Sequence, residues 1–304
     1  MNISLRQLKL FESVARLLSF TRAAAELHLT QPAVSIQIKQ LEESVGLPLF
    51  ENIGKRIYLT DAGKDLYAVC ETILGTLDRF EMEAADRRGL KAGKLKLAVT
   101  TTAKYFVPRL LGPFCERYPG IEVSLKVTNQ SSLLERLTNN EDDLYILGQP
   151  PASLPVVAKP FMENHLVMLA PPDHPLVGTK NIPPERFAEE WLLMREPGSG
   201  TRASTERFFA ERGVAIRERL TLGSNEAIKQ GVMGRLGLAV LSKNTVVLEH
   251  AVGHIAILDV KDFPIQRQWQ IVYSAEKRLS VVAKAFYDYL EEDGVIDFAT
   301  TYHH

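Results

Sequence analysis

The opening part of the chain carries apolar residues at spacings of three and four, which is the pattern of amphipathic helices. Over residues 2–18 this pattern predicts a first helix, formed by Leu5, Leu8, Phe11, Ala15 and Leu18. Between Thr21 and Ser44 two shorter helical patterns follow, separated by a polar break. Thr21 is suited to cap the first of them and Thr30 the second, in which Pro32 fits the first turn. The pattern therefore predicts a helix-turn-helix that packs on the first helix.

The second helix of this pair has two contrasting sides. One is an apolar stripe that we expect to be buried, formed by Val34, Ile38, Leu41 and Val45. The other presents amides, a hydroxyl, a branched apolar group and a lysine, on Gln31, Pro32, Ser35, Ile36, Lys39 and Gln40. In a major groove such amides and hydroxyls contact base edges, an apolar side chain contacts a thymine methyl, and lysine contacts phosphate. We interpret this as a DNA-recognition helix; the alternative is a helical hairpin whose polar side is only solvated.

A short hairpin is predicted over residues 52–60, where a glycine-containing turn precedes alternating apolar and polar positions. Lys55 and Arg56 at its tip are placed to contact phosphate or to enter the minor groove, although each taken singly is as well explained as a solvated charge. The candidate DNA-binding residues are therefore Thr21, Arg22, Thr30, Gln31, Pro32, Ser35, Ile36, Lys39, Lys55 and Arg56.

Beyond Thr60, which we expect to cap it, a long helix is predicted. Its apolar stripe continues for about six turns and consists of Leu66, Val69, Ile73, Leu77, Phe80 and Ala84. No neighbouring segment covers so long a stripe, so we expect the same helix of a second copy to pair with it. Arg87, Arg88 and Gly89 end this helix and begin a hinge.

From Lys94 onward strands alternate with helices. Strands at 95–99, 121–127 and 144–147 and helices at 105–118 and 133–139 predict a βαβαβ unit with a parallel sheet. After a connection at 164–170 the alternation repeats, with strands at 191–194, 220–222 and 238–241 and helices at 201–212 and 226–233. A strand at 268–273 and a helix at 281–291 return to the first part. The pattern predicts two α/β lobes joined by two crossovers, with lobe I at 93–162 and 267–304 and lobe II at 163–266.

Polar residues gather where the predicted strands end and helices begin. In open α/β sheets ligands bind at these ends, and exposed backbone N–H groups there favour an anion. The candidate ligand-binding residues are Thr100, Thr101, Thr102, Asn129, Gln130, Ser131, Gln149, Thr201, Arg202 and Asn225. Any one of these positions is more simply a helix cap. Their convergence on one cleft favours a carboxylate or phosphate ligand.

Composition adds few constraints. The 304 residues are 45% hydrophobic and 24% charged, as in ordinary globular proteins of two or three domains. The two cysteines have no metal or disulfide spacing, and no export signal or membrane-spanning run is evident, so we expect a cytoplasmic protein. The formal net charge is -1, and residues 1–60 carry only a small basic excess, so strong DNA binding requires more than one copy.

The N-terminal residues resemble the winged helix-turn-helix of the LysR-type transcriptional regulators. The resemblance rests on Leu8, Phe11, Phe20, Thr21, Ala24, Ala25, Leu27, Thr30, Gln31, Pro32, Ala33, Ser35, Ile38, Leu41, Glu42, Gly46, Leu49, Phe50, Leu59, Thr60 and Gly63. Within that family the chain further resembles regulators of Calvin-cycle and carbon-dioxide-fixation operons. The residues in question are the runs 35–42, 100–106, 148–151 and 196–202.

The resemblance implies a domain order and a set of partners. The domains would be a winged helix-turn-helix (1–60), a linker helix with its hinge (61–92) and a periplasmic-binding-protein-like effector domain (93–304). The linker helix would pair antiparallel in a homodimer or homotetramer. The partners would be operator DNA, RNA polymerase and a small anionic metabolite, namely a phosphorylated sugar, an organic acid or a nicotinamide nucleotide.

Signatures of other functions are weak. The sequence contains no HExxH, GxSxG or GxGxxG motif and no NTPase phosphate loop, and no nucleophile is paired with a base. His250 and His254 have a helical metal-ligand spacing but no third ligand, so we expect no metal site and no cofactor. We therefore predict a DNA-binding regulator that responds to an anionic metabolite and is not an enzyme. The alternatives are a LysR-type regulator of another metabolic operon, a solute-binding module, and an enzyme fused to a DNA-binding domain.

Overall fold

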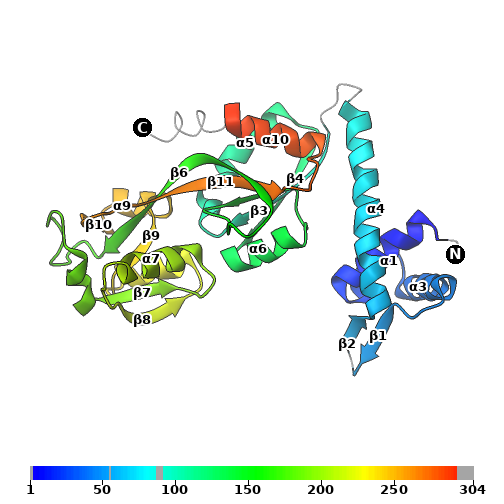
Figure 1. Cartoon of the computed structure of the whole chain (residues 1–304), viewed down its shortest axis with the longest axis horizontal. Coiled ribbons are helices and arrows are strands. Elements are labelled where there is room, and N and C mark those ends of the chain that lie inside the picture. Colours follow the sequence, from blue (N-terminus) through cyan, green and yellow to red (C-terminus); the bar gives the residue numbers. More distant parts are fainter. Residues whose placement is uncertain (1–2, 55, 87–91, 293–304) are drawn as a thin grey trace. The chain divides into compact units, whose positions relative to one another are not determined.

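The computed structural model describes residues 3–54, 56–86 and 92–292, and it divides into two compact units, residues 1–84 and 85–304. Figure 1 shows the helices and strands of each unit. The predictions made for Lys55 and for the hinge at 87–89 lie outside the described residues.

The N-terminal unit is a three-helix bundle followed by a hairpin and a long helix. Its elements are α1 (Leu5–Leu17), α2 (Phe20–Glu26), α3 (Gln31–Val45), β1 (Phe50–Ile53), β2 (Arg56–Leu59) and α4 (Asp61–Asp86). The predicted helix-turn-helix is confirmed, with one correction at its start. Ser19, rather than Thr21, caps α2, because its hydroxyl accepts a hydrogen bond from the Arg22 backbone N–H at 3.3 Å. Thr30 is at the N-cap position of α3, as predicted, but its side chain makes no capping hydrogen bond.

The predicted stripe of α3 forms part of the core of this unit. Val34, Ile38 and Leu41 are at most 3% exposed, and Val45 packs against the same cluster. The Glu42 carboxylate accepts hydrogen bonds from the backbone N–H groups of Leu49 (2.7 Å) and Phe50 (3.2 Å). These bonds attach the hairpin directly to α3, so the two elements have a fixed relation.

The hairpin and the long helix follow as predicted. Strands β1 and β2 pair antiparallel, and Gly54 in the turn between them has a φ of +65°. Thr60 caps α4 by accepting a hydrogen bond from the Gly63 backbone N–H at 3.0 Å. Farther along α4 the apolar stripe is uncovered, with Val69, Ile73 and Phe80 exposed by 50%, 37% and 67%.

Lobe I of the C-terminal unit is a parallel sheet with helices on both faces. Its elements are β3 (Gly93–Thr100), the short helix η1 (Ala103–Tyr105), α5 (Val107–Arg117), β4 (Ile121–Thr128), α6 (Gln130–Thr138), β5 (Leu144–Leu147) and α10 (Val281–Glu292). Strand β3 pairs parallel with both β4 and β5, as predicted. Helices α5 and α10 lie together over one face, where the rings of Phe114 and Phe286 are 4.9 Å apart, and α6 covers the other (Figure 1).

Two long strands connect the lobes. They are β6 (Val156–Ala170) and β11 (Ile265–Ser274), which pair antiparallel along most of their length. The register shifts between Trp269 and Gln270, opposite a segment of β6 that contains Pro160. Because β11 also pairs with β5, the sheet is continuous through both lobes. Its order is β10-β6-β11-β5-β3-β4, with β9 paired to β6, where β9 is Ala239–Ser242 and β10 is Ala256–Leu258. The sequence located only the last part of β6, residues 164–170.

Lobe II encloses the distal half of β6 between two helical layers. Its elements are the short helix η2 (Pro184–Glu189), β7 (Trp191–Arg195), α7 (Gly200–Ala210), β8 (Arg217–Leu222), α8 (Asn225–Met233), β9 (Ala239–Ser242), η3 (Lys243–Thr245), α9 (Val247–Ala251) and β10 (Ala256–Leu258). Alternate residues of β6 belong to different clusters: Leu166 and Met168 pack with the phenylalanines of α7, whereas Val167 and Leu169 pack with α8. Both faces of this sheet are therefore buried.

Candidate functional site

The outer side of α3 carries the predicted recognition residues on a solvent-exposed surface. Gln31, Pro32, Lys39 and Gln40 are exposed, Ser35 is half-buried, and the Ile36 side chain is 56% exposed. The Gln31 amide donates a hydrogen bond to the Ser35 hydroxyl at 2.8 Å, so these two groups lie next to each other at the start of the helix. The exposed part of the Ile36 side chain is thus available for an apolar contact such as a thymine methyl.

The other candidates for DNA binding precede or follow α3 along the chain. Thr21 and Arg22 are exposed on α2, and the Arg22 guanidinium donates to the Leu17 carbonyl oxygen. Arg56 is exposed at the start of β2, beside the turn of the hairpin. The side chains of Thr21, Arg22 and Arg56 are hydrogen-bond donors, and Arg56 is on a hairpin that is fixed to α3. Such donors are suited to contacts with a phosphate backbone.

The C-terminal unit contains a polar cleft at the carboxyl ends of β3 and β4, where the lobes meet the crossover strands. It is lined by Thr100, Thr101, Thr102, Asn129, Gln130, Gly148, Asn164, Ser199, Gly200, Thr201, Arg267 and Trp269. Six of the ten residues predicted to bind a ligand are in this lining: Thr100, Thr101, Thr102, Asn129, Gln130 and Thr201. Residues of both lobes that were predicted from their position at strand ends therefore line the same cleft.

Some of these polar residues cap helices and others do not. Asn129 accepts a hydrogen bond from the Ser132 backbone N–H at 2.9 Å, so its side chain caps α6. Thr102 and Ser199 flank η1 and α7, yet neither side chain makes a capping bond. Ser199 is only 5% exposed. Its hydroxyl and the first N–H groups of α7 are thus available to an anion in the cleft.

Arg267 supplies the positive charge of the cleft. Its guanidinium donates from Nη1 to the Gly200 carbonyl oxygen and to the Ser204 hydroxyl, both at 2.9 Å. Among the described residues no carboxylate is within ion-pairing distance of it. Burial, and then the nearby Arg207, lower the pKa of this group below its usual value. A guanidinium held in this way is stabilised when an anion binds beside it.

Two glycines leave the space that Arg267 and its neighbours occupy. A Cβ added at Gly148 would lie 2.5 Å from Nη2 of Arg267, and one at Gly200 would lie 1.9 Å from the Gln130 side-chain oxygen. Any larger residue at either position would displace a polar group that lines the cleft.

Two buried polar atoms of residues that line the cleft have no hydrogen-bond partner within the described part of the chain. They are the side-chain oxygen of Asn164, a residue that is 3% exposed, and the indole nitrogen of Trp269, a residue that is 2% exposed. Buried polar groups are normally paired, so these atoms indicate a site completed by a bound molecule. Together with Arg267 they offer donors and an acceptor to a small polar anion.

The remaining predicted ligand residues have other roles. Ser131 is exposed and its backbone N–H donates to the Gly198 carbonyl oxygen at 3.2 Å, while Gln149 accepts from Gln130 through its backbone oxygen. The prediction that Arg202 lies near the anion needs correction. Its guanidinium donates to the carboxylates of Glu206 (2.7 Å) and Glu218 (2.9 Å), so its charge is already neutralised.

Asn225 belongs to a buried network that joins the lobes. Its side-chain oxygen accepts from Arg195, whose side chain is 1% exposed. Arg195 also donates to Glu196 at 2.7 Å and 2.9 Å, and to the Thr101 hydroxyl of lobe I at 3.1 Å. One buried arginine of lobe II thus reaches a residue of the cleft lining in lobe I.

A second contact between the lobes is more exposed. The Lys104 ammonium of lobe I is 2.9 Å from the Glu226 carboxylate of lobe II, which also accepts a hydrogen bond from the Tyr105 hydroxyl. Burial by itself raises the pKa of the Glu226 carboxyl, but these hydrogen bonds outweigh it and lower the pKa to about 2. The same arrangement raises the pKa of Tyr105, chiefly through burial.

The sequence analysis missed Arg267, Trp269 and Asn164. All three are on the crossover strands β6 and β11, whereas we searched only the loops at which strands lead into helices. A signal was present, because Arg267 and Trp269 are two residues apart and therefore point to the same face of a strand.

The paired histidines do not have the helical geometry that their spacing indicated. Helix α9 ends at Ala251, so His254 lies beyond it, and His250 Nδ1 is 3.0 Å from the Ile255 carbonyl oxygen. No group of three metal-ligating side chains is present in the described part of the chain. The described helices also include none that is long and apolar enough to cross a bilayer.

Comparison with known proteins agrees with both units. The profile of the LysR substrate binding domain matches residues 88–294, and that of the bacterial regulatory helix-turn-helix protein, lysR family, matches residues 5–64. The chain is 53% identical to the RuBisCO operon transcriptional regulator of Acidithiobacillus ferrooxidans, covering 94% of this chain and 93% of that protein. It is 50% identical to the HTH-type transcriptional activator CmpR of Synechocystis, covering 95% of each.

A solved structure resembles the C-terminal unit. The regulatory domain of CcmR from Synechocystis PCC6803, in complex with 2-PG, is 50% identical with a TM-score of 0.64, covering 69% of this chain and 98% of that one. The two profiles account for most of the sequence, and the relatives match it over nearly their whole length. The chain therefore belongs to the LysR family of bacterial regulatory helix-turn-helix proteins.

Proposed function

We propose that this chain regulates carbon-dioxide-fixation genes by binding operator DNA and responding to a small anionic metabolite in the cleft. The main support for a response to an anion is that the Arg267 guanidinium lines the cleft and has no carboxylate partner among the described residues. The target genes are inferred from relatives, because a protein 53% identical over 94% of the chain is named for the RuBisCO operon.

The metabolite that we propose is 2-phosphoglycolate or a close analogue. It combines a phosphate and a carboxylate, and the CcmR domain that is 50% identical to this chain was solved with 2-PG. The cleft presents the Arg267 guanidinium, the Trp269 indole N–H, the Ser199 hydroxyl and the first N–H groups of α7. Such donors favour a compact molecule that carries several negative charges over a neutral sugar.

The DNA-binding role rests on the outer side of α3 and on the uncovered stripe of α4. We propose that a second copy of the chain covers Val69, Ile73 and Phe80, whose exposure leaves a large apolar surface in water. Two recognition helices would then bind two half-sites, which supplies the phosphate contacts that a single weakly basic domain lacks. We place this assembly in the cytoplasm, and RNA polymerase is a further proposed partner.

The effector is tested by titrating the full-length protein with 2-phosphoglycolate. Trp269 lies in the cleft and the only other tryptophan, Trp191, is 42% exposed on β7, so a change in tryptophan emission reports binding in the cleft. We expect Arg267→Gln to weaken binding about ten-fold or more, because a charge-assisted hydrogen bond is lost. Arg202→Gln should bind as the natural chain does, since Arg202 is paired with Glu206 and Glu218.

The target is tested by footprinting the protein on the intergenic DNA beside its own gene, with and without 2-phosphoglycolate. Protection of two half-sites that changes with the metabolite supports the proposal. If the protein protects no site near carbon-fixation genes, the gene assignment is wrong. If Arg202→Gln abolishes binding and Arg267→Gln does not, the cleft assignment is wrong.

A further inference from the structure

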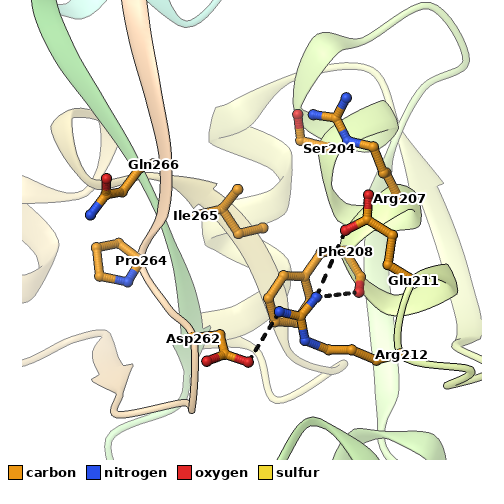
Figure 2. Close-up of a pocket in the computed structure, with 9 residues that line it drawn as sticks. All are labelled: Ser204, Arg207, Phe208, Glu211, Arg212, Asp262, Pro264, Ile265 and Gln266. Atoms are coloured by element: carbon orange, nitrogen blue, oxygen red, sulfur yellow. Dashed lines mark hydrogen bonds and ion pairs between the residues drawn. The ribbon is translucent and has the colours of Figure 1, made fainter.

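A second pocket lies in lobe II, between the outward side of α7 and the beginning of β11 (Figure 2). Its volume is about 460 Å³, which is within the range of small-molecule sites. It is lined by Ser204, Arg207, Phe208, Glu211 and Arg212 on one wall and by Asp262, Pro264, Ile265 and Gln266 on the other. None of these residues is in the lining of the cleft described above.

One end of this pocket holds two carboxylates, whose charge a single arginine neutralises in part. Arg212 donates to the Asp262 carboxylate at 3.0 Å, lies 4.0 Å from the Glu211 carboxylate, and is stacked 3.8 Å from the centroid of the Phe208 ring. Figure 2 shows this guanidinium between the two carboxylates. Both acidic residues of the lining therefore already share one arginine.

The other end carries an unmatched positive charge. Arg207 is exposed, and no described carboxylate is within ion-pairing distance of its guanidinium, which Figure 2 shows beside Ser204 at the opposite end of the pocket from Asp262. The Ser204 hydroxyl accepts a hydrogen bond from Arg267, so a second guanidinium lies directly behind it. The charge on Arg207 is, after burial, a cause of the lowered pKa of Arg267. These like charges repel each other, and an anion beside Arg207 relieves that repulsion.

We propose that the Arg207 end of this pocket is a second anion-binding site, for the phosphate or carboxylate of a small metabolite distinct from the one in the cleft. Arg207 offers a planar fork of N–H donors, and Gln266 offers a side-chain amide from the opposite wall. Glu211 and Asp262 do not repel this anion strongly, because Arg212 lies between them and neutralises part of their charge.

The site is tested on the full-length protein with inorganic pyrophosphate as the probe, by calorimetry at constant ionic strength. The cleft is first saturated with 2-phosphoglycolate, and tryptophan emission verifies that Trp269 senses no further change. We expect pyrophosphate to bind once per chain, and Arg207→Gln to weaken this binding about ten-fold. The matched control is Arg186→Gln, an exposed arginine of η2 that makes no ion pair with any described residue and should have no effect.

Two results would overturn the proposal: no pyrophosphate binding once the cleft is full, or equal weakening by Arg207→Gln and Arg186→Gln. The test of this second site can be decided whether or not 2-phosphoglycolate binds in the cleft. If 2-phosphoglycolate does not bind, the same titration is made with Arg267→Gln, in which the cleft has lost its charge. Dependence on Arg207 in that background still supports the site, and independence of Arg207 refutes it.

Discussion

Replacing Arg195 by alanine should strongly destabilise the C-terminal unit. The side chain is 1% exposed and holds the Glu196 carboxylate with two hydrogen bonds, while also donating to Asn225 and Thr101. Removing one partner of a buried ion pair typically costs about 3–5 kcal/mol, because the remaining charge stays desolvated. Glu196 retains 20% exposure, so we expect the lower end, about 3 kcal/mol.

A matched control is Arg235→Ala in the same lobe. Arg235 forms an ion pair with Asp173, but the two side chains are 65% and 59% exposed, and such pairs contribute about 0–1 kcal/mol. Both tryptophans, Trp191 and Trp269, are in the C-terminal unit, so urea unfolding followed by fluorescence reports that unit alone. If Arg195→Ala lowers the free energy of unfolding by no more than Arg235→Ala does, the buried network has been misread. Adding Glu196→Gln to Arg195→Ala should recover part of the loss, since it removes the stranded charge.

Three further predictions concern other parts of the chain. Because the folded-state pKa of Glu226 is about 2, against an ordinary 4.5, its contribution to stability is complete above pH 4.5 and is lost as the pH falls toward 2. In Glu226→Gln the free energy of unfolding should therefore depend less on pH over this range. The Glu226 side chain is 49% exposed, so we expect this difference to be below about 1 kcal/mol. Ile36→Ala should reduce discrimination between operator and random DNA by about 1–3 kcal/mol in gel-shift titrations, whereas Lys39→Ala should weaken both and lower the salt dependence; equal effects of the two would contradict the groove assignment. Val69→Glu should give monomers in sedimentation, whereas Gly75→Glu, on the other side of α4 with open space at its Cβ, should not; dimers with both would exclude the stripe as the interface.

The sequence predicted elements well where a single periodicity dominates. The stripe of α3 and the three strands of the βαβαβ unit in lobe I are examples, because burial on one side or on both leaves a regular apolar pattern. The first eight residues of β6 (156–163) were not recognised, since all of them are at least partly exposed and they include Pro160, which disfavours an internal strand. Helix caps were less reliable, as shown by Ser19 at the start of α2.

Prediction of the ligand site succeeded for residues at strand ends and failed for charge. Arg202 and Arg267 differ in their carboxylate partners, of which one is near in sequence and one is distant. Glu206, four residues after Arg202 on the same helix, pairs with it at 2.7 Å and was a local signal. Glu218 follows Arg202 by sixteen residues and neutralises it, whereas Arg267 meets only a carbonyl oxygen and a hydroxyl. The pair of Arg202 with Glu218, and the lack of a described carboxylate beside Arg267, are properties of tertiary structure and have no local pattern.

The shift in register beside Trp269 has a mechanical consequence. Both connections between the lobes are strands of one antiparallel ribbon, so a change in the angle between the lobes must bend or twist that ribbon. An irregularity in a strand pair is a point at which it bends easily, and here that point adjoins Trp269, whose side chain lines the cleft. We therefore expect a metabolite that binds in this cleft to act where the ribbon bends, and so to change the angle between the lobes.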